Sequence, residues 1–252
     1  TPEGLGHELD LILELMHFMM TTFGYDYKAY LATRPAKYLG TEEEWDRATR
    51  ELRLAMERRD LHYEVDEGGG VFYAPKIDIK LIDSLGREWQ GPTHQVDLQA
   101  AKRFNIRYVG PDNALHEPII IHRTVLGSME RFIGGLIEHY GGAFPLWLSP
   151  EQMRVLTISE KTNEYAMKLQ DNLKAEGFRC GIDNSPEKIG AKILRGHSEK
   201  LPYMIVVGPK EAETQNVNVR IRGSSESRSV SVQRFVEIMK EKVKSRTAEL
   251  NI

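Results

Sequence analysis

A segment with two prolines and no lysine, arginine or aspartate, AFPLWLSPEQ at residues 143–152, separates two parts of the chain with different hydrophobic patterns. Before it, runs such as residues 76–82 alternate apolar and polar side chains, which is typical of half-exposed antiparallel strands. After it, short apolar strands alternate with amphipathic helices. The pattern predicts an α+β domain with an antiparallel sheet over 1–146, followed by an α/β domain with a mixed sheet over 147–252.

Helix signals place several elements of the first part. TPEG predicts a helix start with Thr1 as a possible N-cap and Pro2 in the first turn. Thr41 and Glu44 have the spacing of a capping box, which predicts a helix start at that point. In residues 119–140 three isoleucines predict a buried strand, and the residues after them predict a helix with a broad apolar face.

The sequence carries few signs of a membrane or an oxidising compartment. No apolar run approaches the roughly 18–20 residues of a membrane-spanning helix, and no secretory leader is recognisable. Cys180 is the one cysteine, so a disulfide within the chain is impossible. We therefore expect a cytoplasmic protein in a reducing compartment, without a membrane partner.

Charge is distributed unevenly along the chain. Residues 1–150 carry 16 Lys and Arg against 23 Asp and Glu, whereas residues 151–252 carry 18 against 14. A mildly basic second part is consistent with a polyanionic partner, but on charge alone chance variation is the favoured explanation.

Arg131 lies in a predicted helix with a broad apolar face, so its guanidinium must either point to solvent or find an anion. The small residues at 126–128 place free backbone N–H groups at the helix start, where anions are favoured, and an arginine one turn later can add a bidentate contact. A phosphate site is one interpretation. The alternative is an ion pair of Arg131 with Glu130, Glu138 or Asp97.

His122 follows the three isoleucines, and two interpretations of it stay open. It is either a satisfied core histidine or one ligand of a metal site, for which the sequence offers no HxxxH or CxxC spacing. Two stretches, FYAPKIDI and WQGPTHQVDL, place polar side chains on neighbouring predicted strands, which form either a ligand-binding wall or a solvent-exposed sheet face. The side chains of this wall are Tyr73, Lys76, Gln90, Thr93 and Gln95.

Taken together, these stretches resemble one known family over essentially the whole chain. HRTVLGSMERFIGGLIEHYGGAFPLWLSPEQ is similar to motif 3 of class II aminoacyl-tRNA synthetases running into an anticodon-binding domain. ATRPAKYLG, YEVDEGGGVFYAPKIDI, WQGPTHQVDL and PYMIVVGPKE resemble the threonyl-tRNA synthetase family in order and spacing. The resemblance implies part of an antiparallel class II catalytic sheet, activation of threonine by ATP, and transfer of threonine to tRNA.

The resemblance also implies roles for individual residues. Arg131 would contact the γ-phosphate of ATP, with Ser128 in the same pocket, and His122 would be one of three protein ligands of a zinc ion that binds the amino and hydroxyl groups of threonine. A site that binds the hydroxyl discriminates against valine far better than an apolar pocket does. The implied partners are ATP with Mg²⁺, threonine, tRNA and a second subunit of a homodimer. The wall residues Tyr73, Lys76, Gln90, Thr93 and Gln95 would line the nucleotide and amino acid site, and Glu211 and Arg220 would read the tRNA anticodon.

The sequence also departs from the family. Motifs 1 and 2, the other two zinc ligands and the editing region have no counterpart in it, and we expect the missing ligands upstream. In NSPEKIGAKILRG, Pro186 replaces an asparagine and Leu194 replaces an arginine of the family pattern. The preferred hypothesis is the C-terminal part of a threonine–tRNA ligase. The alternative is a truncated, non-catalytic relative that binds tRNA or a protein partner.

Overall fold

The computed structural model describes residues 1–252, which divide into two compact units, Thr1–His139 and Tyr140–Ile252. The domain boundary proposed from the sequence, between residues 146 and 147, stays a prediction. No helix in either unit has both the length and the apolar character needed to cross a lipid bilayer.

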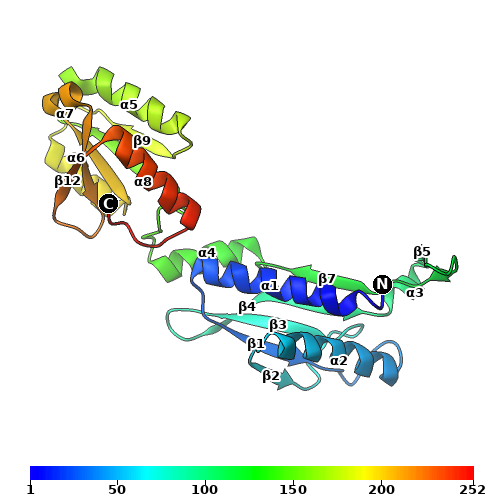
Figure 1. The fold of residues 1–252 in the computed structure, drawn as a ribbon. Coiled ribbons are helices and arrows are strands. Elements are labelled where there is room, and N and C mark those ends of the chain that lie inside the picture. The colour runs from blue at the N-terminus through cyan, green and yellow to red at the C-terminus, as the bar shows by residue number, and fades with distance from the viewer. The chain divides into compact units, whose positions relative to one another are not determined.

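The first unit is built on a five-stranded sheet in the order β2-β1-β3-β4-β7 (Figure 1). Adjacent strands are antiparallel, except that β1 and β2 are parallel, so the sheet is mixed and antiparallel-dominated. A separate two-stranded hairpin joins β5 to β6. The strands are β1 (Tyr27–Ala32), β2 (Tyr63–Asp66), β3 (Lys76–Ile82), β4 (Glu88–Asp97), β5 (Tyr108–Val109), β6 (Leu115–His116) and β7 (Ile120–Thr124).

Four helices accompany this sheet: α1 (Leu5–Phe23), α2 (Glu42–Arg58), α3 (Ala100–Arg103) and α4 (Met129–Tyr140) (Figure 1). The predicted capping box at α2 is confirmed, because Thr41 and Glu44 each accept a hydrogen bond from the other's backbone N–H. The predicted start of α1 is wrong. Gly4 is its N-cap, and the hydroxyl of Thr1 accepts a hydrogen bond from the N–H of Gly4 in a preceding turn.

Residues 119–140 form the predicted strand and helix but are less buried than predicted. Ile119, Ile120 and Ile121 are half-buried, because β7 is the edge strand of the sheet. On α4 only Phe132 and Leu136 are buried. The rest of the predicted apolar face is exposed at Met129, Ile133 and Ile137.

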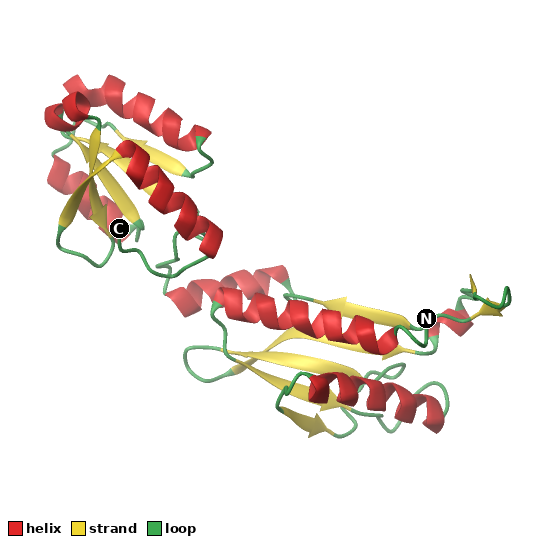
Figure 2. Ribbon diagram, viewed as in Figure 1, coloured by secondary structure: helices red, strands yellow, loops and turns green.

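The second unit contains a mixed five-stranded sheet in the order β12-β11-β10-β8-β9. Figure 2 shows its strands in yellow among red helices. Strands β10, β8 and β9 are parallel, and β11 and β12 run antiparallel. The predicted α/β pattern is therefore confirmed, with β12 as a strand that the sequence analysis missed. The strands are β8 (Met153–Thr157), β9 (Cys180–Asp183), β10 (Tyr203–Val207), β11 (Asn216–Ile221) and β12 (Ser227–Ser231).

Helices cover both faces of this sheet. Apolar side chains of α5 (Asn163–Ala175) and α8 (Val232–Ser245) pack with Tyr203, Ile205 and Val207 on one face. On the other face, α6 (Ile189–Ser198) packs against Leu156, Met204 and Val206. A short 3₁₀ helix, η1 (Glu160–Thr162), precedes α5, and α7 (Pro209–Thr214) follows β10.

Candidate functional site

Asp78 organises the polar wall on strands β3 and β4. Its side chain is buried, and Lys76 Nζ lies 2.6 Å from Oδ2. The hydroxyl of Thr93 donates to Oδ1 at 2.7 Å, and Nε2 of Gln90 donates to the same oxygen at 3.0 Å. Three of the predicted wall residues thus converge on one carboxylate. In the sequence, Asp78 is one polar residue of the alternating run 76–82, and the strand pairing places it level with Thr93.

Tyr73 and Gln95 form a second polar pair beside this wall. The phenol of Tyr73 donates to Oε1 of Gln95 at 2.7 Å. Gln95 lies directly opposite His122 in the pairing of β4 with β7. The rings of Tyr73 and His122 are arranged edge to face, with their centroids 5.7 Å apart. The two predicted wall residues and the predicted metal ligand therefore share one face of the sheet.

His122 is held by Asp97. Its Nε2 lies 2.9 Å from Oδ2 of Asp97, and the histidine side chain is 44% exposed whereas that of Asp97 is 4% exposed. The interpretation of His122 as a core histidine is therefore wrong. The other carboxylate oxygen of Asp97 accepts the N–H groups of Gln99 and Ala100 at 2.7 and 3.0 Å. A buried carboxylate orients an accessible imidazole, as carboxylates do behind metal-binding histidines.

A cavity of about 470 Å³ opens beside this histidine. Its lining combines His122 and Asp97 with aromatic side chains and with the start of α3, and comprises Leu39, Phe72, Tyr73, Asp97, Gln99, Ala100, Arg103, Phe104 and His122. The chain brings together no group of three His, Cys, Asp or Glu side chains that could hold a metal ion. His122 can therefore supply one ligand, and a complete metal site needs ligands from elsewhere.

Arg131 has none of the ion pairs that the sequence offered as an alternative. Glu138 pairs with Arg87 at 3.0 Å, and Asp97 is committed to His122. Glu130 accepts a hydrogen bond from Ser128 at 2.7 Å, which together with a backbone hydrogen bond lowers the pKa of its carboxyl below the usual value. All three candidate anions are thus engaged elsewhere, and the exposed guanidinium of Arg131 is available to a ligand.

Arg131 lines a partly open pocket of about 340 Å³ between α4 and the β3–β4 hairpin. Gln90 of the wall lines the same space. The backbone before α4 approaches β4 closely at Gly127, where φ is 70° and a Cβ would lie 3.1 Å from the carbonyl oxygen of Gly91. Only glycine fits this turn easily, and the turn places the N-terminal end of α4 beside β4.

In the second unit, the predicted anticodon residues lie on two connected elements. Glu211, in α7, accepts the N–H of Gly208 at 2.9 Å. Arg220 is opposite Met204 in the pairing of β10 with β11, so its side chain lies on the sheet face that α6 covers. No hydrogen bond or ion pair engages the half-buried Arg220 within the protein.

The two positions that depart from the family pattern, Pro186 and Leu194, lie in and after the loop that leads into α6. Pro186 lies in the loop before α6, and Leu194 is 68% exposed on that helix. Arg195 is paired with Asp183 at 3.3 Å and with Glu187. Arg195, which follows the unusual Leu194, is thus held by two carboxylates.

Comparison with known proteins agrees with this architecture. The family model for the tRNA synthetase class II core domain (G, H, P, S and T) matches residues 4–140, and the model for an anticodon binding domain matches residues 152–242. The chain belongs to the class II aminoacyl-tRNA synthetase family. The synthetase fold that the sequence predicted, a class II core followed by an anticodon-binding domain, is therefore confirmed.

Within this family the chain is similar to threonine–tRNA ligases. It is 44% identical over 252 residues to the enzyme of Thermotoga maritima and 46% identical over 242 residues to that of Caldanaerobacter subterraneus subsp. tengcongensis. These matches cover 100% and 96% of this chain but 39% and 38% of the two relatives. The chain therefore spans less than half the length of these curated synthetases and corresponds to their C-terminal region.

A crystal structure described as the RNA-binding domain of threonyl-tRNA synthetase from Cryptosporidium parvum Iowa II has a similar fold. The two structures agree with a TM-score of 0.92 at 36% sequence identity, over 96% of this chain and 61% of the other. Both synthetase units of this chain are therefore found together in a solved relative.

Proposed function

We propose that this chain forms part of a threonine–tRNA ligase, in which the first unit contributes to activation of threonine and the second unit binds tRNA. The similarity to threonine–tRNA ligases across both units carries this proposal. In activation, the carboxylate of threonine attacks the α-phosphorus of ATP and pyrophosphate leaves. In transfer, the terminal ribose hydroxyl of tRNA attacks the adenylate carbonyl and AMP leaves.

Arg131 is the proposed phosphate contact. Its guanidinium is exposed and unpaired beside Gln90, so it can form a bidentate hydrogen bond to a phosphate without first breaking an ion pair. Positive charge at this point stabilises negative charge that develops as pyrophosphate leaves. Mg²⁺ arriving with ATP would neutralise the remaining phosphate charge. Lys76, Gln90, Thr93 and Ser128 are the proposed neighbours of the nucleotide, and Tyr73 and Gln95 of threonine.

His122 is the proposed zinc ligand, with Asp97 behind it. The donor set fits one position of such a site, since an accessible imidazole backed by a buried carboxylate is a common zinc ligand. When bound, zinc would supply a Lewis acid for the amino and hydroxyl groups of threonine. The remaining ligands are proposed to come from a part of the protein outside this chain. The role of Asp97 is to hold the imidazole in one orientation.

tRNA is the proposed partner of the second unit. The anticodon-binding family match and the unpaired Arg220 on the α6 face support this proposal, and Glu211 is the proposed second contact. A homodimer, which the family resemblance implies, and a cytoplasmic location belong to the same proposal. The alternative, a non-catalytic tRNA-binding or protein-binding relative, has one observation in its favour: an exposed leucine and a paired arginine stand at Leu194 and Arg195.

The test is threonine-dependent ATP–pyrophosphate exchange by the complete protein and its Arg131→Ala variant. We expect exchange to fall by roughly 100-fold to 1,000-fold, the loss typical of removing one charge-stabilising donor. Arg53→Ala is the matched control, because Arg53 is an exposed arginine on α2, away from the wall. Exchange that is unchanged in Arg131→Ala would remove Arg131 from the site. No exchange by the unaltered complete protein would favour the non-catalytic alternative.

A further inference from the structure

Lys192 is a fully buried lysine in the segment NSPEKIGAKILRG, and neither the family resemblance nor the proposed active site gives it a role. It lies on α6 with 1% of its surface exposed. Its ammonium donates to the carbonyl oxygen of Thr157 at 2.8 Å, to the hydroxyl of Thr157 at 3.1 Å and to the carbonyl oxygen of Asp183 at 3.2 Å. These contacts match the three donors of an ammonium group.

The three contacts tie α6 to the ends of two neighbouring parallel strands. Thr157 is the last residue of β8 and Asp183 the last residue of β9. Further along the helix, α6 is pressed onto the sheet, since a Cβ at Gly196 would lie 2.4 Å from the sulfur of Met204. Burial of an ammonium is costly, so the position of Lys192 persists only because every donor finds an oxygen.

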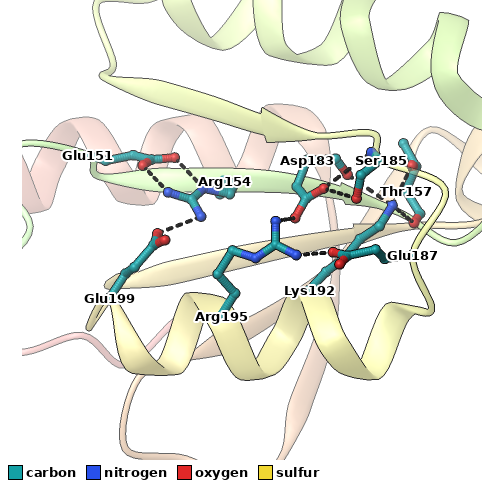
Figure 3. A network of polar contacts seen from close by, with 9 residues as sticks. All are labelled: Glu151, Arg154, Thr157, Asp183, Ser185, Glu187, Lys192, Arg195 and Glu199. Atoms are coloured by element: carbon teal, nitrogen blue, oxygen red, sulfur yellow. Dashed lines mark hydrogen bonds and ion pairs between the residues drawn. The ribbon is translucent and has the colours of Figure 1, made fainter.

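Asp183 extends this cluster into the loop before α6 (Figure 3). Its Oδ1 accepts the hydroxyl of Ser185 at 2.7 Å and the N–H of Ser185 at 3.2 Å, and its Oδ2 pairs with Arg195. Burial raises the pKa of the Asp183 carboxyl, but hydrogen bonds from Ser185 and the charges of Arg195 and Lys192 outweigh burial, so the pKa is lowered overall. Arg195 in turn pairs with Glu187.

The loop at residues 184–188 is thus held at three points. Lys192 holds the carbonyl before it, Asp183 holds Ser185, and Arg195 holds Glu187 (Figure 3). The loop leaves the carboxyl end of a parallel strand, the edge at which open α/β sheets bind ligands. It leads into α6, which covers the sheet face that carries the unpaired Arg220.

We propose that Lys192 is a positioning residue for tRNA recognition: it fixes loop 184–188 in the conformation that the anticodon region of tRNA meets. Lys192 is buried and touches no RNA, so it acts by ordering the loop before binding. A preordered loop costs less conformational entropy on association than a mobile one. This inference rests on the proposed tRNA binding of the second unit.

The experiment compares the complete chain with its Lys192→Met variant, which keeps the length of the side chain and removes its donors. We expect tRNA binding to weaken by about tenfold, because the loop must then be ordered on association. The slope of log K against log salt should stay unchanged, because no phosphate contact is lost. Amide hydrogen exchange across residues 184–188 should become faster in the free protein. Lys168→Met is the matched control, since Lys168 lies on α5 and is 72% exposed.

Each outcome bears on the inference separately from the proposed function. Equal tRNA affinity of the Lys192→Met and unaltered proteins, well below their unfolding temperatures, would overturn the inference and leave tRNA binding intact. A reduced salt slope would make Lys192 an RNA contact and also overturn it. No tRNA binding by the unaltered protein would overturn the proposed binding and the inference together. If Lys192→Met does not fold, Thr157→Val removes the hydroxyl that Lys192 binds, with a smaller expected loss of tRNA affinity and an unchanged salt slope; equal affinity of Thr157→Val and the unaltered protein would then overturn the inference.

Discussion

Nε2 of His122 lies 2.9 Å from Oδ2 of Asp97, and the remaining oxygen of that carboxylate is bound to the backbone at the start of α3. The imidazole orientation is therefore coupled to the conformation of the segment after β4. Asp97→Asn keeps the shape of the side chain. Its amide oxygen can still accept the two backbone N–H groups, so the amide nitrogen replaces the oxygen that faces His122. We expect zinc affinity of the complete protein to fall by about 10-fold to 100-fold, the usual effect of losing such a carboxylate.

Zinc titration of the purified complete protein measures this effect. The β5–β6 hairpin offers a matched control, because Asp112 lies 2.9 Å from Nε2 of His116 in a similar but exposed pair. Asp112→Asn should leave zinc affinity unchanged. If Asp97→Asn binds zinc as tightly as the unaltered protein, His122 is not held for a metal by Asp97.

The predictions that succeeded depend on neighbours in sequence. The capping box at Thr41 and Glu44 is completed within four residues, so the local pattern determines it. The alternation of β3 and β4 likewise placed Lys76 and Thr93 on one face. The wall is visible in sequence because strand periodicity and a short hairpin connection leave few alternatives.

The features that the sequence predicted wrongly or did not reveal depend on residues farther along the chain. The isoleucines before His122 look like a buried strand, yet β7 is the edge of the sheet, and no local pattern reveals which strand is last. Lys192 stands between Ala191 and Ile193 in α6, and its burial follows from oxygens at Thr157 and Asp183. Likewise, the free state of Arg131 follows from Arg87 engaging Glu138.

Arg220 provides a prediction about RNA binding. It is a half-buried arginine without a protein partner on the α6 face, so Arg220→Ala removes a cation without exposing a carboxylate. We expect weaker tRNA binding. If the guanidinium contacts a phosphate, the slope of log K against log salt should become less steep by roughly 0.7–0.9.

Binding assays over a range of salt concentrations measure both quantities. Arg234→Ala is the control, because Arg234 lies on α8, on the opposite face of the sheet, and pairs with Glu237 at 3.0 Å. Equal affinity and equal slope in Arg220→Ala and the unaltered protein would place the RNA on another surface.

Glu44 connects the start of α2 to the segment after β4. Its Oε2 accepts the N–H of Thr41 at 3.1 Å and Nε2 of Gln99 at 2.7 Å, and its other oxygen pairs with Lys102. Glu44→Ala should lower the free energy of unfolding by about 2 kcal/mol, because several hydrogen bonds to a charged group are lost. Thr41→Ala should cost about 1 kcal/mol, because it removes the cap alone.

Urea denaturation of the two variants tests this order. Glu43→Ala is the control, because Glu43 is exposed in the same turn, and its effect should stay within about 0.5 kcal/mol. A cost for Glu44→Ala no larger than that for Thr41→Ala would mean that the contacts to Gln99 and Lys102 contribute nothing to stability.

His94 provides a prediction about pH. It lies on β4 between Ile77 and Arg123, is 1% exposed, and has no hydrogen-bond partner on either ring nitrogen. Burial, with a smaller contribution from the charge of Arg123, lowers the pKa of its imidazole from 6.5 to about 4. The folded state therefore disfavours the protonated form, whereas the unfolded chain accepts the proton near pH 6.5.

The free energy of unfolding should accordingly fall as pH decreases from about 6.5 to about 4 and should level off below that, as far as His94 is concerned. The total loss from this group is on the order of 3 kcal/mol, at about 1.4 kcal/mol per pH unit. His94→Ile replaces the imidazole by an apolar side chain that suits a buried strand, so this part of the pH dependence should disappear. Urea denaturation of both proteins between pH 4 and pH 8 gives the difference directly. Parallel stability curves over that range would show that protonation of His94 does not oppose folding.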